Sequence, residues 1–355
     1  MIYKTILITI LSSIAFYFAF PKHIPFSPSI QEEWVWNKSF KAGIPSFYGF
    51  ENTKEIFAYR IGNEIYSISS NSSFKIAEES TLVEYPPMGK GFLVYKKLGN
   101  SIQFYSNEFE ELWNKNYDSY PRVSPTLDMI LLISGDHNQI EFLNSSGDPK
   151  GIGKLGGRFL TDFQFGYSPS TIAIQFSGGE SYLLSSDGQI LWKKISDSQQ
   201  MEFYKSIAVS FDSKYLAVHS QKGNADFIDV VHVPENKLQY SYQLDRVYPH
   251  KLYFAISQEG VLQILSPNKN LVVGKDGKKI FEEEIRSSIY NPIACYRNGL
   301  VSIVDSKLIV RNHFGNVIYK KSFANLEFPV RILPSLQGAG FYVEDKKEFF
   351  YFHEF

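Results

Sequence analysis

The stretch SSDGQILWKKI, Ser185 to Ile195, decides the fold because the chain repeats its layout. One apparent strand ends before Asp187-Gly188, and a second strand, which carries Trp192, follows this turn. An Asp-Gly pair between two apolar runs is a strong hairpin signal. Trp192 follows Gly188 by four residues. This spacing defines an anchor position that can be searched for along the chain.

The anchor recurs with a regular period. In NHFGNVIYKKSF, Gly315 precedes Tyr319 by four residues, and in GKDGKKIFEEE, Gly277 precedes Phe281 by four. The remaining copies align by the strand pattern around the turn. The eight anchors are Trp36, Ile76, Trp113, Gly151, Trp192, Tyr240, Phe281 and Tyr319, at intervals of 40, 37, 38, 41, 48, 41 and 38 residues. A period near 40 with strand-like content is typical of β-propeller blades.

Each interval divides into four short strands. For the interval that ends near Tyr240, the predicted strands are 205–212, 215–220, 225–232 and 237–244, separated by polar or glycine turns. Composition agrees with an all-β chain, since aromatic residues make up 16% of it and long stretches alternate apolar and polar positions.

The two ends of the chain complete one another. After Tyr319 there are three strand patterns, FPVRILPS, GAGFYVED and KKEFFYFHEF, and no fourth. The N-terminal EEWVWNKSF is a fourth strand without a first three. We therefore predict a single ring, closed when this strand pairs with the C-terminal three, which removes exposed sheet edges. The count is eight four-stranded blades, or seven if the glycine-rich copy at Gly151 is not a true outer strand.

The first residues differ in kind from the rest. In MIYKTILITILSSIAFYFAFPK, residues 2–20 are largely apolar, and as a helix they would span about 28 Å, close to the hydrocarbon thickness of a bilayer. Residues 1–22 therefore predict a hydrophobic helix that is an uncleaved signal anchor or a cleaved signal peptide, with a soluble core helix as the third reading. We assign 23–31 to a linker and 32–355 to the propeller. The propeller is expected to be extracytoplasmic and membrane-anchored, or secreted or periplasmic after cleavage.

Charge and cysteine content exclude several classes. The net charge is −1 and no run of Lys or Arg is present, so nucleic acid is not an expected partner. The single cysteine, Cys295, excludes an internal disulfide and any multi-cysteine metal cluster. It lies in the apolar stretch IYNPIACY and is predicted to be buried and inert.

The repeats resemble those of the quinoprotein-like and WD-repeat-like β-propellers. Asp187 to Trp192 is similar to the outer-strand motif of quinoprotein-like repeats, and SIAVSFDSKYLAVHS is similar to the inner strands of WD-type blades. The resemblance covers residues 32–355 in pattern. The chain departs from both families, because it lacks repeated Trp-Asp and Gly-His pairs, the full tryptophan-docking consensus of pyrroloquinoline enzymes and a vicinal cysteine pair. The resemblance thus implies the fold and no cofactor, and it is strongest to non-catalytic envelope propellers that scaffold other proteins.

Catalytic and metal motifs are not found. GIGKLGG, residues 151–157, fits the G-x-G-x-x-G pattern, but strands stand on both sides of it where dinucleotide binding needs a following helix. His219 and His232 fall on adjacent predicted strands, where packing or a hydrogen bond is the expected role, and the histidines show no metal-ligand spacing. No Gly-x-Ser-x-Gly occurs. The sequence predicts no catalytic residue, metal or cofactor.

A second signature, an aromatic residue that is usually followed by proline, comes seven to eleven residues after each anchor. In a propeller, the link from an outer strand to the next inner strand runs toward the axis, so these corners should ring one mouth of the central channel. Aromatic and basic groups there would suit an acidic peptide or a small anion. The alternative is that the aromatics pack between blades while the cations are merely solvated. The predicted binding residues are Tyr85, Tyr120, Arg122, Lys205, Tyr248, His250, Tyr290, Phe328 and Arg331.

Together these features predict a non-catalytic binding scaffold, exported or membrane-anchored, that mediates protein–protein interaction in a cell-envelope complex. Fold alone does not fix function. Two alternatives remain open: a hydrolase or lyase acting on a sugar or peptide in the channel mouth, and a sensor of a small anion. Converging carboxylates would favour the enzyme. The corners are instead aromatic and basic, which favours the scaffold.

Overall fold

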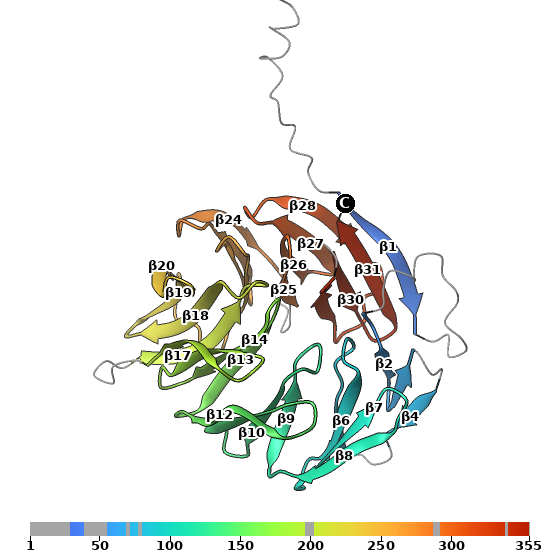
Figure 1. Cartoon of the computed structure of the whole chain (residues 1–355). Helices are drawn as coiled ribbons and strands as arrows, with labels where there is room; N and C mark the ends of the chain where they lie inside the picture. The colour runs from blue at the N-terminus through green and yellow to red at the C-terminus, as the bar shows by residue number, and fades with distance from the viewer. Residues whose placement is uncertain are drawn as a thin grey trace, which may run out of the picture.

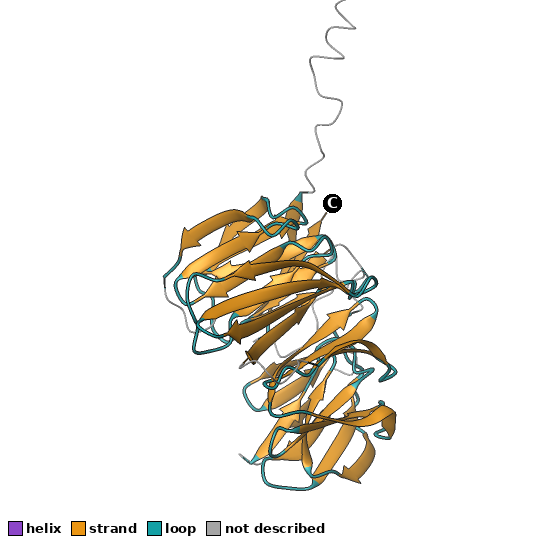
Figure 2. Ribbon diagram, turned by 90° about the vertical axis from the view of Figure 1, so that its left-hand side faces the viewer, coloured by secondary structure: helices purple, strands orange, loops and turns teal. Residues whose placement is uncertain are grey.

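The computed structural model describes residues 29–38, 55–68, 72–76, 80–195, 202–286, 292–337 and 340–354. All regular elements in these ranges are β-strands, as Figure 2 shows. Nothing in this described part forms a helix capable of spanning a membrane. The hydrophobic helix predicted over 1–22 lies outside it. The first described strand begins at Ile30, inside the predicted linker.

Eight antiparallel sheets form the blades (Figure 1). Blade 1 contains β2 (Ala58–Ile61), β3 (Glu64–Ser67) and β4 (Ser73–Lys75). Blade 2 contains β5 (Thr81–Glu84), β6 (Gly91–Lys96), β7 (Ser101–Ser106) and β8 (Glu111–Asn116). Blade 3 contains β9 (Ser119–Val123), β10 (Ile130–Ser134), β11 (Gln139–Leu143) and β12 (Pro149–Gly156). Blade 4 contains β13 (Leu160–Tyr167), β14 (Ser170–Phe176), β15 (Ser181–Ser185) and β16 (Ile190–Lys194).

Blade 5 contains β17 (Glu202–Val209), β18 (Tyr215–Lys222), β19 (Ala225–His232) and β20 (Lys237–Gln243). Blade 6 contains β21 (Tyr253–Ile256), β22 (Leu262–Ser266), β23 (Lys269–Val273) and β24 (Lys279–Glu284). Blade 7 contains β25 (Ile293–Tyr296), β26 (Gly299–Val304), β27 (Lys307–Asn312) and β28 (Val317–Ser322). Blade 8 contains β29 (Arg331–Pro334), β30 (Gly340–Glu344), β31 (Glu348–Glu354) and β1 (Ile30–Asn37). In blades 2 to 8 the first-named strand is the innermost and the last-named is the outermost.

The predicted closure is confirmed. β1 pairs antiparallel with β31, with Ile30 opposite Glu354 and Asn37 opposite Glu348. Figure 1 shows β1 running along the outside of β31, beside the C-terminus. The count of eight is also confirmed, because the glycine-rich copy forms a true outer strand, β12, which pairs with β11. The strands of blade 5 agree with the predicted bounds to within three residues.

Neighbouring blades are joined by buried apolar clusters, so the ring is closed by packing as well as by hydrogen bonds. Between blades 8 and 1, Trp36 packs with Tyr59 and Leu333. Ring planes of Trp36 and Tyr59 meet edge to face, with centroids 4.4 Å apart. Similar clusters lie at the other seven blade contacts in the described part of the chain. Burial of these inner faces is the main stabilising force for the sheets.

The anchor residues explain why the chain repeats its opening motif. Trp113, Trp192 and Tyr240 lie on the outer strands of blades 2, 4 and 5, and each contacts a turn of the next blade. Trp192 Nε1 donates a hydrogen bond to Asn236 Oδ1 at 2.9 Å, and Trp113 Nε1 donates to the Ser145 carbonyl at 2.9 Å. Tyr240 donates its hydroxyl to the Gly260 carbonyl at 2.8 Å. The repeated motif is therefore a contact between blades.

At the degenerate copy, Gly151, the backbone makes the contact with the next blade, and no side chain is needed. Gly151 has a φ of +74°, and a Cβ placed there would lie 2.5 Å from the Cα of Gly188. The backbone N–H of Ile152 donates to the Gly188 carbonyl at 3.3 Å. The backbone of β12 thus lies directly on the Asp187-Gly188 turn of blade 4, in the place that an anchor ring takes elsewhere. Only glycine allows this approach.

The axis is filled on one side of the ring and open on the other. Inner strands β13, β17, β21 and β25 contact one another in sequence. Tyr167 and Phe211 stack there with ring centroids 5.8 Å apart, and Cys295 Sγ donates to the Val209 carbonyl at 3.4 Å. The open axial space is a cavity on the other side, lined by residues of blades 8, 1 and 2.

Replacing Trp192 by Ala should lower the free energy of unfolding by about 3–5 kcal/mol, because a buried ring and its hydrogen bond to the next blade are lost. The matched control is its neighbour Leu191, which is 48% exposed. Leu191→Ala should change stability by no more than about 0.5 kcal/mol. Urea unfolding of both variants measures the difference. An equal loss of unfolding free energy in the two variants would contradict the role of Trp192 as a contact between blades.

Cys295 should resist thiol reagents in the folded protein. It is fully buried, and burial raises the pKa of its thiol to about 12, so almost no thiolate forms at neutral pH. Labelling by a thiol-reactive dye should be negligible in the native state and complete in urea. Rapid native labelling would show that the axis near Cys295 is open.

Candidate binding site

The structure separates the predicted corner residues. Tyr85, Arg122 and Arg331 gather around the open axial space, whereas Lys205 and Tyr248 meet in a buried network in blade 5. Tyr120, His250 and Phe328 stand apart from both groups. Tyr290 lies outside the described residues. The single ring of nine corner residues at one mouth is therefore not formed.

Two of the corners are also differently placed along the chain. Tyr85 follows β5 instead of preceding it, because the inner strand already begins at Thr81. Tyr120 and Pro121 lie within β9. A proline is tolerated there because β9 is the inner edge strand of its blade, with one row of N–H groups outside the sheet ladder. Tyr248 and Phe328 do precede inner strands, as predicted.

Arg331 is held in place by two partners. Its Nε donates to Glu344 Oε2 at 2.8 Å, and its Nη2 contacts the same carboxylate and donates to the Tyr85 hydroxyl at 3.1 Å. Lys38, at the end of β1, donates from Nζ to Glu344 Oε1 at 2.7 Å. The side chains of Lys38 and Glu344 are only 3% and 6% exposed. A buried carboxylate therefore joins the closing strand, the inner strand of blade 8 and blade 2.

Arg122 is likewise paired. Its Nη1 lies 2.5 Å from Glu84 Oε1 and 3.2 Å from the Tyr95 hydroxyl. Arg122 and Arg331 were expected either to bind a ligand or to be solvated. The structure corrects the solvated reading, because both are bound to carboxylates that burial would otherwise leave uncompensated.

The charges around the open axial space balance locally. Burial acts to raise the pKa of Glu344, but Arg331 and Lys38 outweigh it and hold that pKa below its usual range. Burial raises the pKa of Glu84, against the opposing effect of Arg122 and Arg331. Each of these carboxylates faces a cation and not a second carboxylate.

A cavity of about 930 Å³ lies beside this cluster, between blades 8, 1 and 2. We call it the axial cavity. Its walls include Arg60, Glu84, Tyr85, Arg331, Glu344 and Lys346. Sequence reasoning found Tyr85 and Arg331 through the corner signature. It missed Arg60, on β2, and Lys346, in the turn between β30 and β31, because neither position carries a repeated signal.

Lys205 and Tyr248 belong to a structural network. Lys205 Nζ donates to both oxygens of Asp226, at 2.8 and 2.9 Å, and to the Tyr248 carbonyl at 2.6 Å. His219 Nε2 lies 3.0 Å from Asp226 Oδ2. The Lys205 side chain is only 4% exposed. These two predicted binding residues are therefore closed to a ligand, and they stabilise the link from blade 5 to blade 6.

The two strand histidines do not meet. His219 lies opposite Ile228 in the sheet, while His232 lies opposite Tyr215, at the other end of the same pair of strands. Burial lowers the pKa of His219, against the opposing effect of Asp226. No group of three or more His, Cys, Asp or Glu side chains in the described ranges is placed to hold a metal ion.

Several exposed apolar side chains lie on one face of the ring, while most of the others lie on outer strands. This turn face carries the hairpin turns between the second and third strands of the blades and the links from outer to inner strands. Four exposed apolar residues on this face, here called the apolar row, are Leu98 (90% exposed) in blade 2, Phe159 (49%) in the link from blade 3 to blade 4, Ile195 (63%) after β16 and Phe203 (49%) in β17. Phe159 and Phe203 carry the corner signature, but Leu98 has no signal in the sequence beyond its position in a turn.

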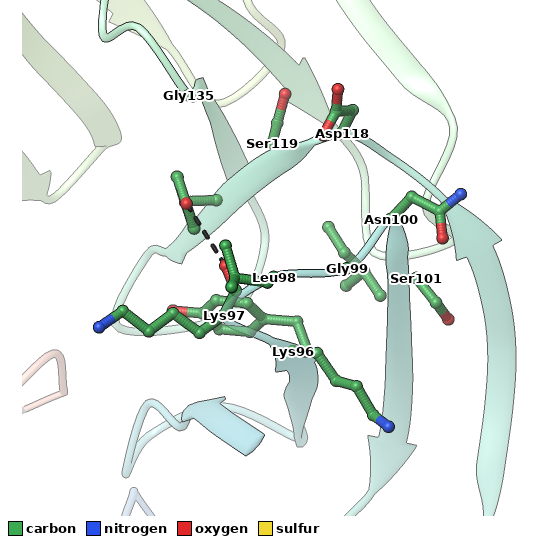
Figure 3. A pocket seen from close by; sticks show the side chains of 12 residues that line it. Lys96, Lys97, Leu98, Gly99, Asn100, Ser101, Asp118, Ser119 and Gly135 are labelled. Atoms are coloured by element: carbon green, nitrogen blue, oxygen red, sulfur yellow. Dashed lines mark hydrogen bonds between the residues drawn. The ribbon is translucent and has the colours of Figure 1, made fainter. Parts of the chain in front are cut away.

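A groove of about 460 Å³ runs beside Leu98, between the β6–β7 turn and β9. Figure 3 shows Leu98 and Gly99 on the turn, with Ser119 on the strand across from them. The predicted binding residue Tyr120 lines this groove and donates to the Lys97 carbonyl at 3.4 Å. The groove gives the apolar row a recess into which a partner side chain can pack.

The start of β1 and the end of β31 lie on the opposite face. Ile30 and Glu354 are paired at one end of blade 8, whereas Asn37 and Glu348 are paired at the other end, next to the turn between β30 and β31. That turn belongs to the turn face. The described strands therefore start and finish on the face away from the apolar row.

Acidification should destabilise the fold through His219. Because its pKa is lowered in the folded state, the unfolded chain binds more protons below pH 6.5, the ordinary histidine value, so stability falls as the pH falls. The slope contributed by one such group is at most about 1.4 kcal/mol per pH unit. In urea unfolding between pH 7 and pH 5, His219→Gln should show a shallower decline than the parent chain. Parallel curves would contradict a neutral, buried His219.

Comparison with known proteins agrees with the architecture. No protein-family model matches the chain. BamB from Moraxella catarrhalis matches 91% of this chain and 99% of its own, with a TM-score of 0.58 and 11% identity. Kluyveromyces lactis Hsv2 matches 73% of this chain and 92% of its own, with a TM-score of 0.52 and 13% identity. At these identities the likeness is one of fold.

A search of curated proteins gives a local match. The chaperone protein HtpG of Nitrobacter hamburgensis is 33% identical over 95 residues, which cover 25% of this chain. The match spans only 15% of the length of that protein. It carries no argument about activity. On its strand order, its closure and its structural neighbours, the chain is an eight-bladed β-propeller.

Proposed function

We propose that this propeller is a non-catalytic scaffold, exported and held in a cell-envelope complex, that docks a partner protein on its turn face. The observation that carries the proposal is the apolar row. Exposed apolar side chains that gather on one face mark interaction sites more often than scattered ones do. Aromatic anchors beside a recess supply most of the binding free energy in such contacts. The propeller fold itself suits an interaction scaffold.

The position of the chain ends supports a protein partner over a lipid surface. If residues 1–22 anchor the chain, as the sequence predicts, the seven residues 23–29 can reach at most about 25 Å from the membrane. They join β1 at Ile30, on the face opposite the apolar row. The apolar row then points away from the bilayer, toward other proteins of the envelope.

The charges in the open axial space support a binding role over a catalytic one. Glu344 is shared by Arg331 and Lys38, Glu84 is bound by Arg122, and the buried Asp226 is bound by Lys205. A glycosidase-type site needs two carboxylates that face a common substrate. Among the described residues in these clusters, each carboxylate is committed to a cation.

Crosslinking in living cells tests the docking face. A photo-crosslinking amino acid at Tyr120, in the groove beside the apolar row, should capture a specific envelope protein. The variant Leu98→Ser, Phe159→Ser, Phe203→Ser should lose that capture because it removes the apolar contact area. Its Tm should stay within about 2 °C, since exposed residues contribute little to stability.

A matched variant controls for the loss of exposed apolar area as such. Leu112, Leu238 and Phe314 are 54%, 54% and 62% exposed on outer strands or on the opposite face. Their replacement by Ser should leave the same partner captured. Capture that survives the first triple variant, or no protein captured by any form, would contradict the proposal. Recovery of the full chain in the cytosolic fraction would contradict the export part alone.

A further inference from the structure

We infer that the axial cavity binds a small organic monocarboxylate that has an apolar body. This inference is independent of the docking face, because the cavity walls and the apolar row share no residue. It rests on a preorganised arginine edge, on the charge balance of the cavity wall and on the apolar surface beside the cationic groups.

Arg331 supplies the first part of the site. Its Nε and Nη2 are occupied by Glu344 and Tyr85, and its guanidinium carbon lies 5.1 Å from the centre of the Tyr85 ring. These contacts fix the plane of the guanidinium. Nη1 has no hydrogen-bond partner among the described residues, and the side chain is 39% exposed on the cavity wall. A fixed guanidinium edge with free N–H donors is well suited to a carboxylate.

The acidic groups of the cavity are already occupied. Glu344 is shared by Lys38 and Arg331, and Glu84 is bound by Arg122. Asp345 accepts from the backbone N–H groups of Lys347 and Glu348 at 2.7 and 2.6 Å. These carboxylates therefore leave no acidic partner for further cations of the wall.

Two cations of the wall remain without an acidic partner within the described residues. Arg60 Nε donates to the Gly62 carbonyl at 2.8 Å, and Lys346 makes no ion pair there. The described wall holds four cationic side chains, Lys38, Arg60, Arg331 and Lys346, against three acidic ones, Glu84, Glu344 and Asp345. Because Glu84 is already paired with Arg122, which is not among these four cations, the wall keeps a surplus of positive charge that favours an anionic ligand such as a carboxylate.

The rest of the wall is apolar. Ile61, Val83, Pro329 and the ring of Tyr85 line the cavity beside the cations. A volume of about 930 Å³ lies within the range of small-molecule sites, about 300–1,000 Å³. An ion such as inorganic phosphate would pair with the cations of this wall but would make no apolar contact with the rest of it. A monocarboxylate with an apolar body satisfies both parts.

Isothermal titration calorimetry of the full chain with benzoate tests the site, with benzamide as the neutral analogue and inorganic phosphate as the anion without an apolar body. We expect benzoate to bind, and benzamide and phosphate to bind at least about 10-fold more weakly, because each lacks one of the two interactions. The variant Arg60→Gln, Lys346→Gln should weaken benzoate about 10-fold or more.

Two further variants keep the result interpretable. Arg331→Lys retains the charge next to Glu344 but removes the fork of donors, and it should weaken benzoate while the protein stays folded. Lys275→Gln with Lys278→Gln removes two exposed cations from the β23–β24 turn and should leave binding unchanged. The apolar-row variant should also bind benzoate normally, which separates this site from the docking face.

Three results would overturn the inference. One is the absence of benzoate binding to the parent chain. Another is equal binding of benzoate and benzamide, which would show that the cations play no part. The third is phosphate binding as tight as benzoate binding and equally lost in the arginine variants, which would identify an oxyanion site without an apolar part.

Discussion

The ring depends on contacts in which the outer strand of one blade lies on a turn of the next. Trp192 and Trp113 make such a contact with indole N–H groups, and Tyr240 makes one with a hydroxyl. At Gly151 the backbone itself makes the contact. Apolar clusters lie at all eight blade contacts of the described chain, so no blade buries its apolar face alone. Stability of this kind is a sum of nearest-neighbour terms around a circle.

The position of the axial cavity follows from how the circle is filled. Tyr167, Phe211 and Cys295 occupy the axis on the side of blades 4 to 7. The space that remains lies next to blade 8, where the closing strand ends at Lys38. Glu344 therefore has two roles. It bonds the closing strand through Lys38, and it holds the Arg331 guanidinium on the cavity wall. Ring closure and the geometry of the cavity share one carboxylate.

The sequence was sufficient for the fold because the fold is a repeat. Period, strand count and the unmatched strands at the two ends require no long-range contact to be known, and the structure confirms them. The site was only partly predictable. Tyr85 and Arg331 do meet, but whether Lys205 faces a ligand or Asp226 depends on the register between β17 and β19 and on the path of the link to blade 6. The corner pattern carries no information on either. Leu98 was missed for a related reason, since exposure in a hairpin turn leaves no periodic signal.

Closure by β1 also determines when, during synthesis and folding, the ring can be completed. Asn37 and its partner Glu348 are separated by 311 positions in sequence, so the strand that completes the ring is among the first to be made and must wait for the last. Until β1 pairs with β31, blade 8 lacks its outer strand and one edge of β31 has no partner strand. Contacts of such long sequence separation form slowly, and open strand edges associate with other chains. A nascent propeller of this design is therefore most exposed to misassembly late in synthesis, after seven blades have formed and before β1 has paired with β31.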